Sequence, residues 1–287
     1  MTVTHGPVVI RRRLGHVLKR LRSDRNLQLA EVAKRLEISP SKLSRIETGA
    51  VEPKYRDVRD LLDIYEAPVE QRDRVLDWAT EAKSPGWWEP FSPTVVASEN
   101  LDMLASLEAE SRSKRTFAIP VSGLLQTETY ARSLLGASQL GMAAEEVDRM
   151  VQIRMRRQDV IDTERTDAAP LEIHVVLDEV ALHRVTDPAI VRGQVQALLE
   201  RMEQPNVTLQ ILPFSAGWTR ATSTFSIFEP RDPDTDWPVV NVESTENDGY
   251  YDGEQTVAIY EAVWRDLLTK ALDETATRQV LLARLSS

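Results

Sequence analysis

Apolar residues recur between residues 27 and 49 at the intervals of two short helices separated by a turn. The first helix has an apolar stripe with spacings of three and four residues: Leu29, Val32, Ala33 and Leu36. Ser39 can cap the second helix through its hydroxyl, and Pro40 follows at the first helical position, where no N–H is needed. Gly49 can end this helix as its C-cap. The pattern predicts a helix-turn-helix.

The predicted second helix, residues 40–48, presents polar side chains opposite its two core residues, Leu43 and Ile46. These polar side chains are Ser41, Lys42, Ser44 and Arg45. In the major groove of DNA, Arg and Lys can donate to O6 and N7 of guanine, and Ser can donate or accept. We therefore expect a surface that reads DNA bases. The alternative is that Lys42 and Arg45 only solvate one helix of an ordinary bundle.

Further amphipathic patterns surround this motif. Three segments have apolar positions at helical spacing: residues 11–26, 54–65 and 69–83. Residues 11–83 are therefore predicted to form an all-α helix-turn-helix domain of about five helices. Residues 1–10 show no period and are expected to be a flexible tail. The run Arg11, Arg12 and Arg13 can either reach DNA as a basic arm or solvate the start of a helix.

Residues 84–97 form a Trp/Pro-rich segment in which three prolines and a glycine interrupt the helical pattern. This composition predicts a linker between two domains. Its Trp87, Trp88 and Phe91 are expected to pack on one of the domains, because exposed aromatic rings are unfavourable in water. A contact with a partner protein is the alternative.

Residues 98–287 mix helical and extended patterns. Helical spacing is found at residues 101–107, 123–135, 145–161, 189–202, 255–271 and 273–285. Strands are predicted at residues 171–177, 207–212, 224–229 and 239–243, with a short extended segment at residues 117–121. This order predicts a mixed α+β C-terminal domain with a central sheet. The order of the strands in the sheet does not follow from the pattern.

The charge of the chain is divided between the two predicted domains. The net charge is −10, from 35 Lys and Arg against 45 Asp and Glu. Residues 1–65 contain 14 Lys or Arg and 8 Asp or Glu, a charge of +6, which leaves −16 for the remainder. Positive charge concentrated on one module is what phosphate binding requires, so the acidic remainder is expected to serve another purpose.

The composition excludes several classes of protein. The chain has no cysteine, which excludes disulfides, zinc ribbons, iron–sulfur clusters and thiol nucleophiles. No apolar run approaches the ~20 residues of a membrane span, and residues 1–10 lack the apolar core of a signal peptide. We expect a cytoplasmic protein that associates with the nucleoid.

Catalytic and metal-binding motifs are weak. Asp178, Glu179 and His183 stand close together, but they lack the two-His spacing of zinc hydrolases. The chain has neither a glycine-rich phosphate loop nor a Gly-x-Ser-x-Gly nucleophile motif. We expect no enzyme activity, no metal and no cofactor. Residues 213–218 can be a loop that lines a small-molecule pocket or an ordinary turn packed by aromatic side chains.

Residues 14–65 resemble the Cro/C1-type helix-turn-helix of the xenobiotic-response-element family, with residues 41–49 matching its recognition helix. The resemblance implies a structural ion pair between Arg22 and Glu47. Glu37 stands where the family usually has Gly, and a left-handed conformation there would cost roughly 1–2 kcal/mol. The expected DNA contacts are Gln28, Ser39, Ser41, Lys42, Ser44, Arg45, Thr48, Lys54 and Arg56.

Four later segments resemble a C-terminal domain that follows such modules in actinomycetes, in WhiJ-like, antitoxin-like regulators of development. They are residues 123–132, 176–184, 206–217 and 239–243. In these regulators the gene commonly lies beside one for a small partner protein. The resemblance implies that the acidic domain binds this partner and tunes DNA binding.

These observations lead to one main hypothesis. The chain is expected to be a sequence-specific transcription regulator and repressor that reads the major groove with residues 40–48. A homodimer would read two half-sites about 34 Å apart. A small partner protein would control it through the C-terminal domain. The alternatives are a C-terminal domain that senses a small molecule, and an enzyme fused to a DNA tether.

Overall fold

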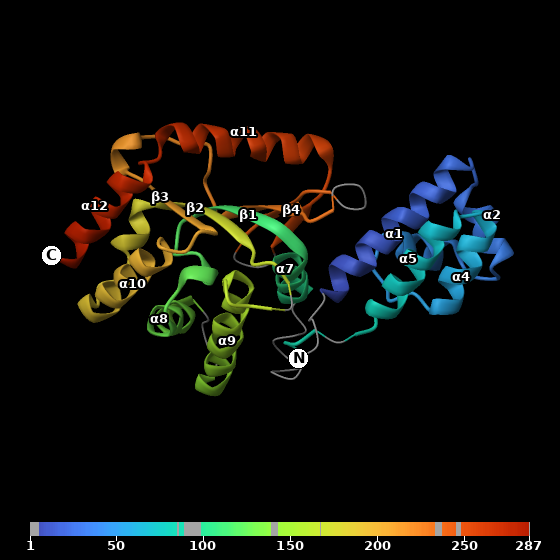
Figure 1. Ribbon diagram of the computed structural model, residues 1–287, viewed down its shortest axis with the longest axis horizontal. Helices are drawn as coiled ribbons and strands as arrows, with labels where there is room; N and C mark the ends of the chain where they lie inside the picture. The colour runs from blue at the N-terminus through green and yellow to red at the C-terminus, as the bar shows by residue number, and fades with distance from the viewer. Residues whose placement is uncertain are drawn as a thin grey trace.

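Five helices form a bundle at the N-terminal side of the computed structural model, which describes residues 6–84, 86–88, 99–138, 143–166, 168–232, 237–244 and 248–286 (Figure 1). They are α1 (Pro7–Asp24), α2 (Leu29–Arg35), α3 (Pro40–Glu47), α4 (Tyr55–Ile64) and α5 (Val69–Glu81). Fully buried aliphatic side chains fill the space between them, among them Leu14, Leu18, Val32, Leu43 and Leu61. The predicted all-α domain of about five helices is confirmed.

Helix α1 begins earlier than the sequence pattern predicts. Residues 7–10, which we expected in a flexible tail, form its first turn, with Pro7 at the start. Val9 and Ile10 are buried. Val9 packs with apolar residues of the C-terminal region: Leu107, Phe228 and Val239. Part of this turn faces the C-terminal region and not the bundle. The apolar pattern of the bundle helices therefore could not predict that residues 7–10 are helical. Residues 1–5 lie outside the described residues.

The predicted linker packs on the C-terminal region over the part that the structure describes. Trp88 is fully buried, and its indole Nε1 donates to Oδ1 of Asp102 in α7 (Glu99–Glu110). The ring of Trp87 meets that of Trp88 edge-on, and its centroid lies 4.7 Å from Cζ of Arg156. These contacts stabilise the chain where it enters the second region. Phe91 lies outside the described residues.

A six-stranded mixed sheet forms the centre of the C-terminal region, so the predicted α+β fold is confirmed. Its strands are β1 (Ser111–Ala118), β2 (Glu172–Asp178), β3 (Val207–Leu212), β4 (Phe225–Pro230), β5 (Val239–Val242) and β6 (Gly249–Tyr251). They lie in the order β3-β2-β1-β4-β5-β6. The first three strands are parallel to one another, whereas β4, β5 and β6 each run antiparallel to the neighbour on the β1 side.

The central strand β1 is the one that the sequence pattern largely misses. The pattern predicts an extended segment only at residues 117–121, whereas the strand spans Ser111–Ala118. Lys114 and Thr116 are buried on one face of the sheet, and Arg115 is half-buried on the other. The pattern predicts a buried strand only from apolar residues, so it does not predict a central strand whose side chains are partly polar.

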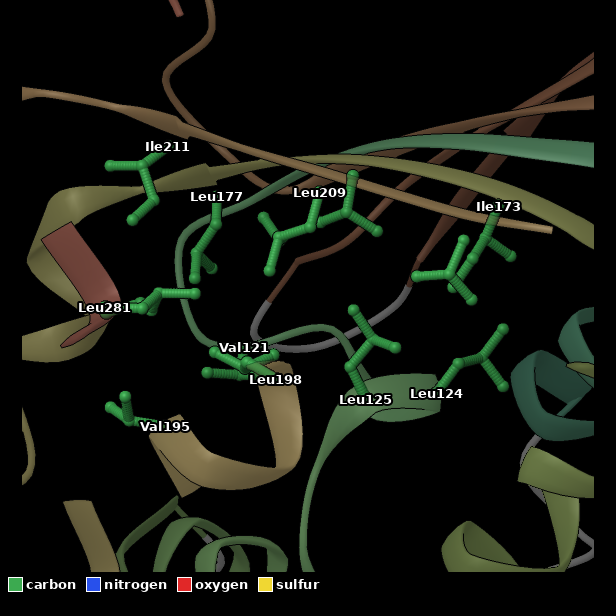
Figure 2. Close-up of a cluster of buried hydrophobic side chains, with 14 of the residues drawn as sticks. Val121, Leu124, Leu125, Ile173, Leu177, Val195, Leu198, Leu209, Ile211 and Leu281 are labelled. Atoms are coloured by element: carbon green, nitrogen blue, oxygen red, sulfur yellow. The ribbon is translucent and has the colours of Figure 1, made fainter. Parts of the chain in front are cut away.

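Helices cover both faces of the sheet (Figure 1). One face carries α7, α8 (Glu128–Ser138), α9 (Ala144–Arg157) and α10 (Pro188–Arg201), with α12 (Glu274–Leu285) packed on α10. The other carries α11 (Glu254–Lys270). Figure 2 shows the core of the first face, which includes Leu124, Leu177, Leu198, Leu209 and Leu281. The core beneath α11 includes Phe117, Val176, Phe225, Trp264 and Leu267.

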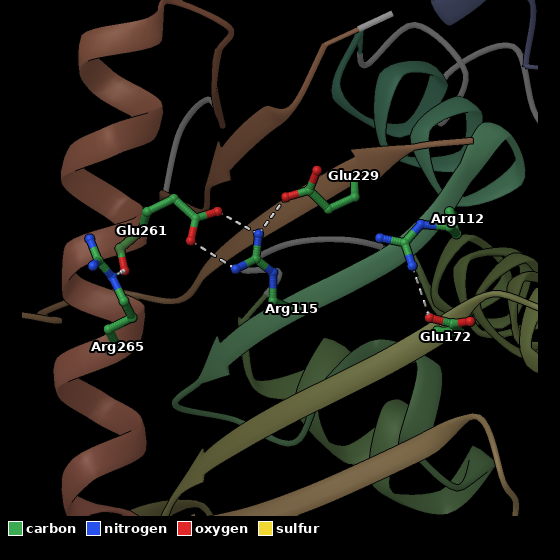
Figure 3. A network of polar contacts seen from close by, with 6 residues as sticks. All are labelled: Arg112, Arg115, Glu172, Glu229, Glu261 and Arg265. Atoms are coloured by element: carbon green, nitrogen blue, oxygen red, sulfur yellow. Dashed lines mark hydrogen bonds and ion pairs between the residues drawn. The ribbon is translucent and has the colours of Figure 1, made fainter. Parts of the chain in front are cut away.

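An ion-pair network fastens α11 to the sheet (Figure 3). Arg115 of β1 donates from Nη1 to Glu261 Oε2 at 2.8 Å and from Nη2 to Glu229 Oε1 at 2.5 Å. Burial alone would lower the pKa of Arg115, but its hydrogen bond to Glu261 and the nearby carboxylate charges raise it. Since Glu229 lies on β4 and Glu261 on α11, a single guanidinium connects three elements.

A second network lies buried on the opposite face. Glu108 of α7 is 0% exposed and accepts from Arg157 Nε at 2.8 Å, Arg157 Nη2 at 2.7 Å and Lys114 Nζ at 2.9 Å. Burial would raise the pKa of this carboxyl group, but the charges of Arg157 and Lys114 outweigh burial and lower the pKa to about 2. Glu108 therefore joins α7, α9 and β1 as a carboxylate.

This lowered pKa predicts a pH-dependent stability. An unfolded Glu has a pKa of about 4.3, so the stabilisation from Glu108 is complete above that pH and is lost as pH falls toward 2. Glu108→Gln should lower the free energy of unfolding at neutral pH by about 3–5 kcal/mol, because two buried cations lose their counter-ion. Urea unfolding followed by circular dichroism at several pH values measures both effects. The exposed Glu172→Gln is the control, and an unchanged pH slope in Glu108→Gln would contradict the assignment.

Candidate nucleic-acid interface

Helix α3 begins where its sequence predicts and ends at Glu47, one residue before the predicted end. The hydroxyl of Ser39 accepts a hydrogen bond from the backbone N–H of Lys42 at 3.1 Å, and Pro40 occupies the first turn. The helix ends at Glu47, and Gly49 follows with a φ of +69°, in the left-handed region that favours glycine. This cap and this ending fix the length and direction of the exposed helix face.

The face of α3 opposite the core is polar and open to solvent. Leu43 and Ile46 are buried beneath it. The exposed side chains are Ser41, Ser44, Arg45 and Thr48. The guanidinium of Arg45 has no ion-pair or hydrogen-bond partner in the described part of the chain, whereas the Thr48 hydroxyl donates to the backbone oxygen of Ser44 at 3.0 Å. Arg45 is therefore free to donate to another molecule.

Lys42 is not the fully exposed, base-reading side chain that we expected. It is half-buried, and its Nζ pairs with Oδ2 of Asp57 in α4 at 2.5 Å. The two residues are 15 positions apart, so only the packing of α3 against the start of α4 brings them together. Lys42 thus connects two helices of the module, and Arg45 is the unpaired cation of the α3 face.

The remaining expected contacts lie at the starts of neighbouring helices. Gln28 is exposed at the N-cap of α2, and Lys54 is exposed at the N-cap of α4. The side chain of Arg56, in the first turn of α4, is 82% exposed and lies 3.5 Å from Asp60. Helix N-termini present unpaired backbone N–H groups, which suit phosphate oxygens. Ser39 is also exposed, but its hydroxyl already caps α3.

The ion pair between Arg22 and Glu47 holds α3 against α1. Arg22 Nε donates to Glu47 Oε1 at 2.7 Å, and Nη2 donates to Oε2 at 2.9 Å. Glu47 is nearly fully buried, with a side chain 3% exposed. Arg22 also donates to the backbone oxygen of Leu27, and the Tyr65 hydroxyl lies 3.5 Å from Glu47. The hydrogen bond to Glu47 raises the pKa of Arg22 above its usual value.

Close backbone packing supports this ion pair. A Cβ atom on Gly15 of α1 would lie 2.5 Å from the backbone oxygen of Ile46, and one on Gly49 would lie 2.7 Å from Cα of Arg12. Larger side chains would therefore push α1 and α3 apart. Ala33 is likewise fully buried between the helices. The position of the α3 face depends on these small residues.

The turn between α2 and α3 keeps a left-handed residue without a glycine. Glu37 has a φ of +55° and is exposed. This left-handed conformation costs a residue with a Cβ roughly 1–2 kcal/mol.

The other side of α1 faces the C-terminal region. Arg12 lies 3.6 Å from Asp252, Arg13 lies 3.6 Å from Glu110, and the ring of His16 meets that of Trp237 with centroids 3.9 Å apart. Arg12 and Arg13 therefore contact the acidic region. They do not extend as a free basic arm.

The Arg22–Glu47 pair predicts a strong coupling in stability. Glu47→Leu should destabilise the N-terminal bundle by about 3–5 kcal/mol, because it leaves Arg22 buried without a counter-ion. The double variant Arg22→Met with Glu47→Leu should be much less destabilised. Thermal and urea unfolding of the four proteins of the cycle measure the coupling. Arg35→Ala, in an exposed pair, is the control and should change stability by less than about 1 kcal/mol. Additive effects would contradict the role of the pair.

Two known families match parts of this chain. A helix-turn-helix domain matches residues 13–75, which indicates DNA binding and a regulatory role. A domain of unknown function, DUF5753, matches residues 101–283. Comparison with curated proteins and with solved structures gives no significant match.

Within the part of the chain that the structure describes, no helix is long and apolar enough to cross a membrane. No group of three or more His, Asp or Glu side chains is placed to hold a metal ion in the same residues. Since the match to the domain of unknown function covers more than half of the sequence, the chain belongs to the DUF5753 family and carries a helix-turn-helix domain before it.

Proposed function

We propose that this protein is a sequence-specific transcription repressor of the Cro/C1 type, and that α3 enters the major groove of its operator. One observation carries the proposal. Arg45 is exposed on α3, and its guanidinium has no partner among the described residues. Arg is the side chain that most often recognises guanine, through O6 and N7. Ser41 and Ser44 flank it and can add hydrogen bonds to neighbouring bases.

Contacts with the DNA backbone would position this face. Lys54 and Arg56 at the start of α4, and Gln28 at the start of α2, are exposed where phosphates would pass. The positive charge of residues 1–65 supports such binding, since phosphate neutralisation supplies most of the non-specific affinity. The pairing of Lys42 with Asp57 favours a structural role for Lys42, with any DNA contact made by its remaining N–H donors.

We further propose that two copies bind one operator. Helix-turn-helix repressors read half-sites about 34 Å apart on one face of the duplex, and one copy presents only one α3. Two copies bound at a promoter would exclude other proteins from it, which is the simplest route to repression. Such a protein would be associated with the nucleoid.

Control through the C-terminal domain is supported by the contacts of α1. The same helix packs on α3 at Gly15 and on the C-terminal region at Val9, Arg12 and Arg13. A signal that changes the second contact can therefore reach the first. The resemblance to WhiJ-like, antitoxin-like regulators supports a small partner protein as that signal. The second candidate signal is a small molecule. A polar cavity beside α9 favours this candidate.

An exposed tryptophan offers a contact for the partner protein. Trp218 is 97% exposed, and Phe214 close by in sequence is also exposed. Large aromatic residues are enriched at protein interfaces. The purified product of a neighbouring gene should release the repressor from its operator, and Trp218→Ala should weaken this release. Electrophoretic mobility shift with both purified proteins measures it. A product that leaves the DNA complex unchanged would contradict control by this partner.

The reading of bases by Arg45 predicts a loss of discrimination. Arg45→Ala should remove about 1–3 kcal/mol of preference for the operator over a site with a changed guanine, because a bidentate contact is lost. Lys54→Ala should instead weaken binding to all sequences alike and lower the salt dependence. Fluorescence anisotropy with matched duplexes at several salt concentrations separates the two. An equal loss on every duplex for Arg45→Ala would make Arg45 a phosphate contact.

A further inference from the structure

A polar cavity lies in the C-terminal region on the face of the sheet that carries α7, α8 and α9. Its volume is about 190 Å³, and it is lined by Lys114, Thr116, Gln126, Arg154, Arg157 and Glu243, among others. At about 30 Å³ for each water molecule, it has room for roughly six of them, or for a small organic molecule. The cavity is separate from the expected DNA contacts, all of which lie on α2, α3, α4 or the caps beside them.

The topology of the sheet favours a binding site at this place. Residues 120–123 and Gln126, which follow the carboxyl end of β1, form one wall of the cavity. On one side of β1 the neighbour is the parallel strand β2, and on the other it is the antiparallel strand β4. Ligand sites of α/β sheets commonly lie beyond the carboxyl ends of strands where the direction of the connections changes.

Arg154 is the cation of this cavity that lacks a counter-ion. Lys114 and Arg157 both form ion pairs with Glu108. The guanidinium of Arg154 makes one side-chain hydrogen bond, from Nη1 to Gln126 Oε1 at 2.8 Å, and no carboxylate of the described residues lies within 4.0 Å of it. Burial, followed by the charge of Arg157, lowers the pKa of Arg154 to about 10, so it remains a cation at neutral pH. Its other N–H donors are open to a ligand.

Acceptor groups on the strand side complement this cation. The side chain of Glu243, which follows β5, has no hydrogen-bond or ion-pair partner among the described residues, and burial raises its pKa. Thr116, Ser226 and Asn241 form a buried row across β1, β4 and β5 on the same face. The Oδ1 atom of Asn241 is buried and has no hydrogen-bond partner. Thr116 and Ser226 are hydrogen-bonded to each other at 3.0 Å, and Glu243 is exposed to solvent. Buried polar atoms are normally satisfied, so the unpaired Oδ1 of Asn241 points to a missing occupant.

We propose that this cavity binds a small organic acid whose carboxylate or phosphate group pairs with Arg154 and whose hydroxyl or ammonium group donates to Glu243. The lining cations and anions nearly balance: Lys114, Arg154 and Arg157 stand against Glu243, Asp248 and the adjacent Glu108. A ligand that carries both an oxyanion and a donor group matches this arrangement. A purely apolar ligand would leave both Arg154 and Glu243 unpaired.

The cavity also has a physical route to the N-terminal bundle, and this consequence rests on the proposed DNA-binding function. Arg157 in the cavity wall is bonded to Glu108 of α7. The adjacent Ser106 and Leu107 of α7 contact Gly6 and Val9 at the start of α1. A ligand that shifts α9 or α7 would therefore change how α1 is held.

Isothermal titration calorimetry of the full chain, without DNA, tests the site with inorganic phosphate, L-malate and L-glutamate in turn. At least one of them should bind with a stoichiometry of one. Arg154→Gln should weaken that binding by about tenfold or more, because a charged hydrogen-bonded contact is lost. Arg192→Gln, an exposed arginine on α10, is the matched control and should bind as the original protein does. Binding of phosphate alone identifies a phosphate ligand, and binding of malate or glutamate alone identifies a carboxylate.

Two results would overturn the proposal. The first is that none of the three compounds binds the original protein at millimolar concentration. The second is binding that Arg154→Gln leaves unchanged. Circular dichroism and the melting temperature of Arg154→Gln show whether the variant is folded. Since Arg154 has no counter-ion to lose, we expect an unchanged fold. Operator affinity with and without the bound compound is measured separately, so a failure of DNA binding does not affect the test of the cavity.

Discussion

The close packing of α1 against α3, locked by the buried Arg22–Glu47 ion pair, is the constraint on which the exposed polar face of α3 depends. Gly15 allows the two backbones to meet, and Glu47 occupies the last turn of α3 itself. The carboxylate is therefore buried at one end of the helix while Arg45, two residues earlier, is exposed. A helix fixed in this way presents its polar face without the loss of conformational entropy that a mobile α3 would undergo on binding.

The same helix α1 joins the two parts of the chain. Its first turns pack on α7 through Val9, and its arginines pair with acidic side chains of the C-terminal region. Glu108 belongs to α7, and its buried carboxylate connects α7 to β1 and α9. Polar networks of this kind are stable only when every member is satisfied, so an added or lost charge changes the arrangement of several elements at once. The acidic C-terminal region is therefore physically connected to α1, the helix that packs on α3.

The parts of this structure that local signals encode could be predicted from the sequence, and the parts that depend on distant contacts could not. Ser39, Pro40 and Gly49 define α3 because a cap, a first-turn proline and a left-handed ending act within a few residues. β1 is largely missed because Lys114, Arg115 and Thr116 in its middle are polar, and Lys114 and Arg115 find their partners on other elements. The pairing of Lys42 with Asp57 also depends on packing between helices.

Protection of guanine N7 from methylation by dimethyl sulfate tests the central claim most directly, because N7 lies in the major groove where α3 is proposed to bind. Guanines should be protected in two patches about 10 base pairs apart. In Arg45→Ala, one guanine of each patch should lose its protection. Unchanged methylation of every guanine in a bound, specific complex would contradict the central claim, since the protein would then read DNA by another surface.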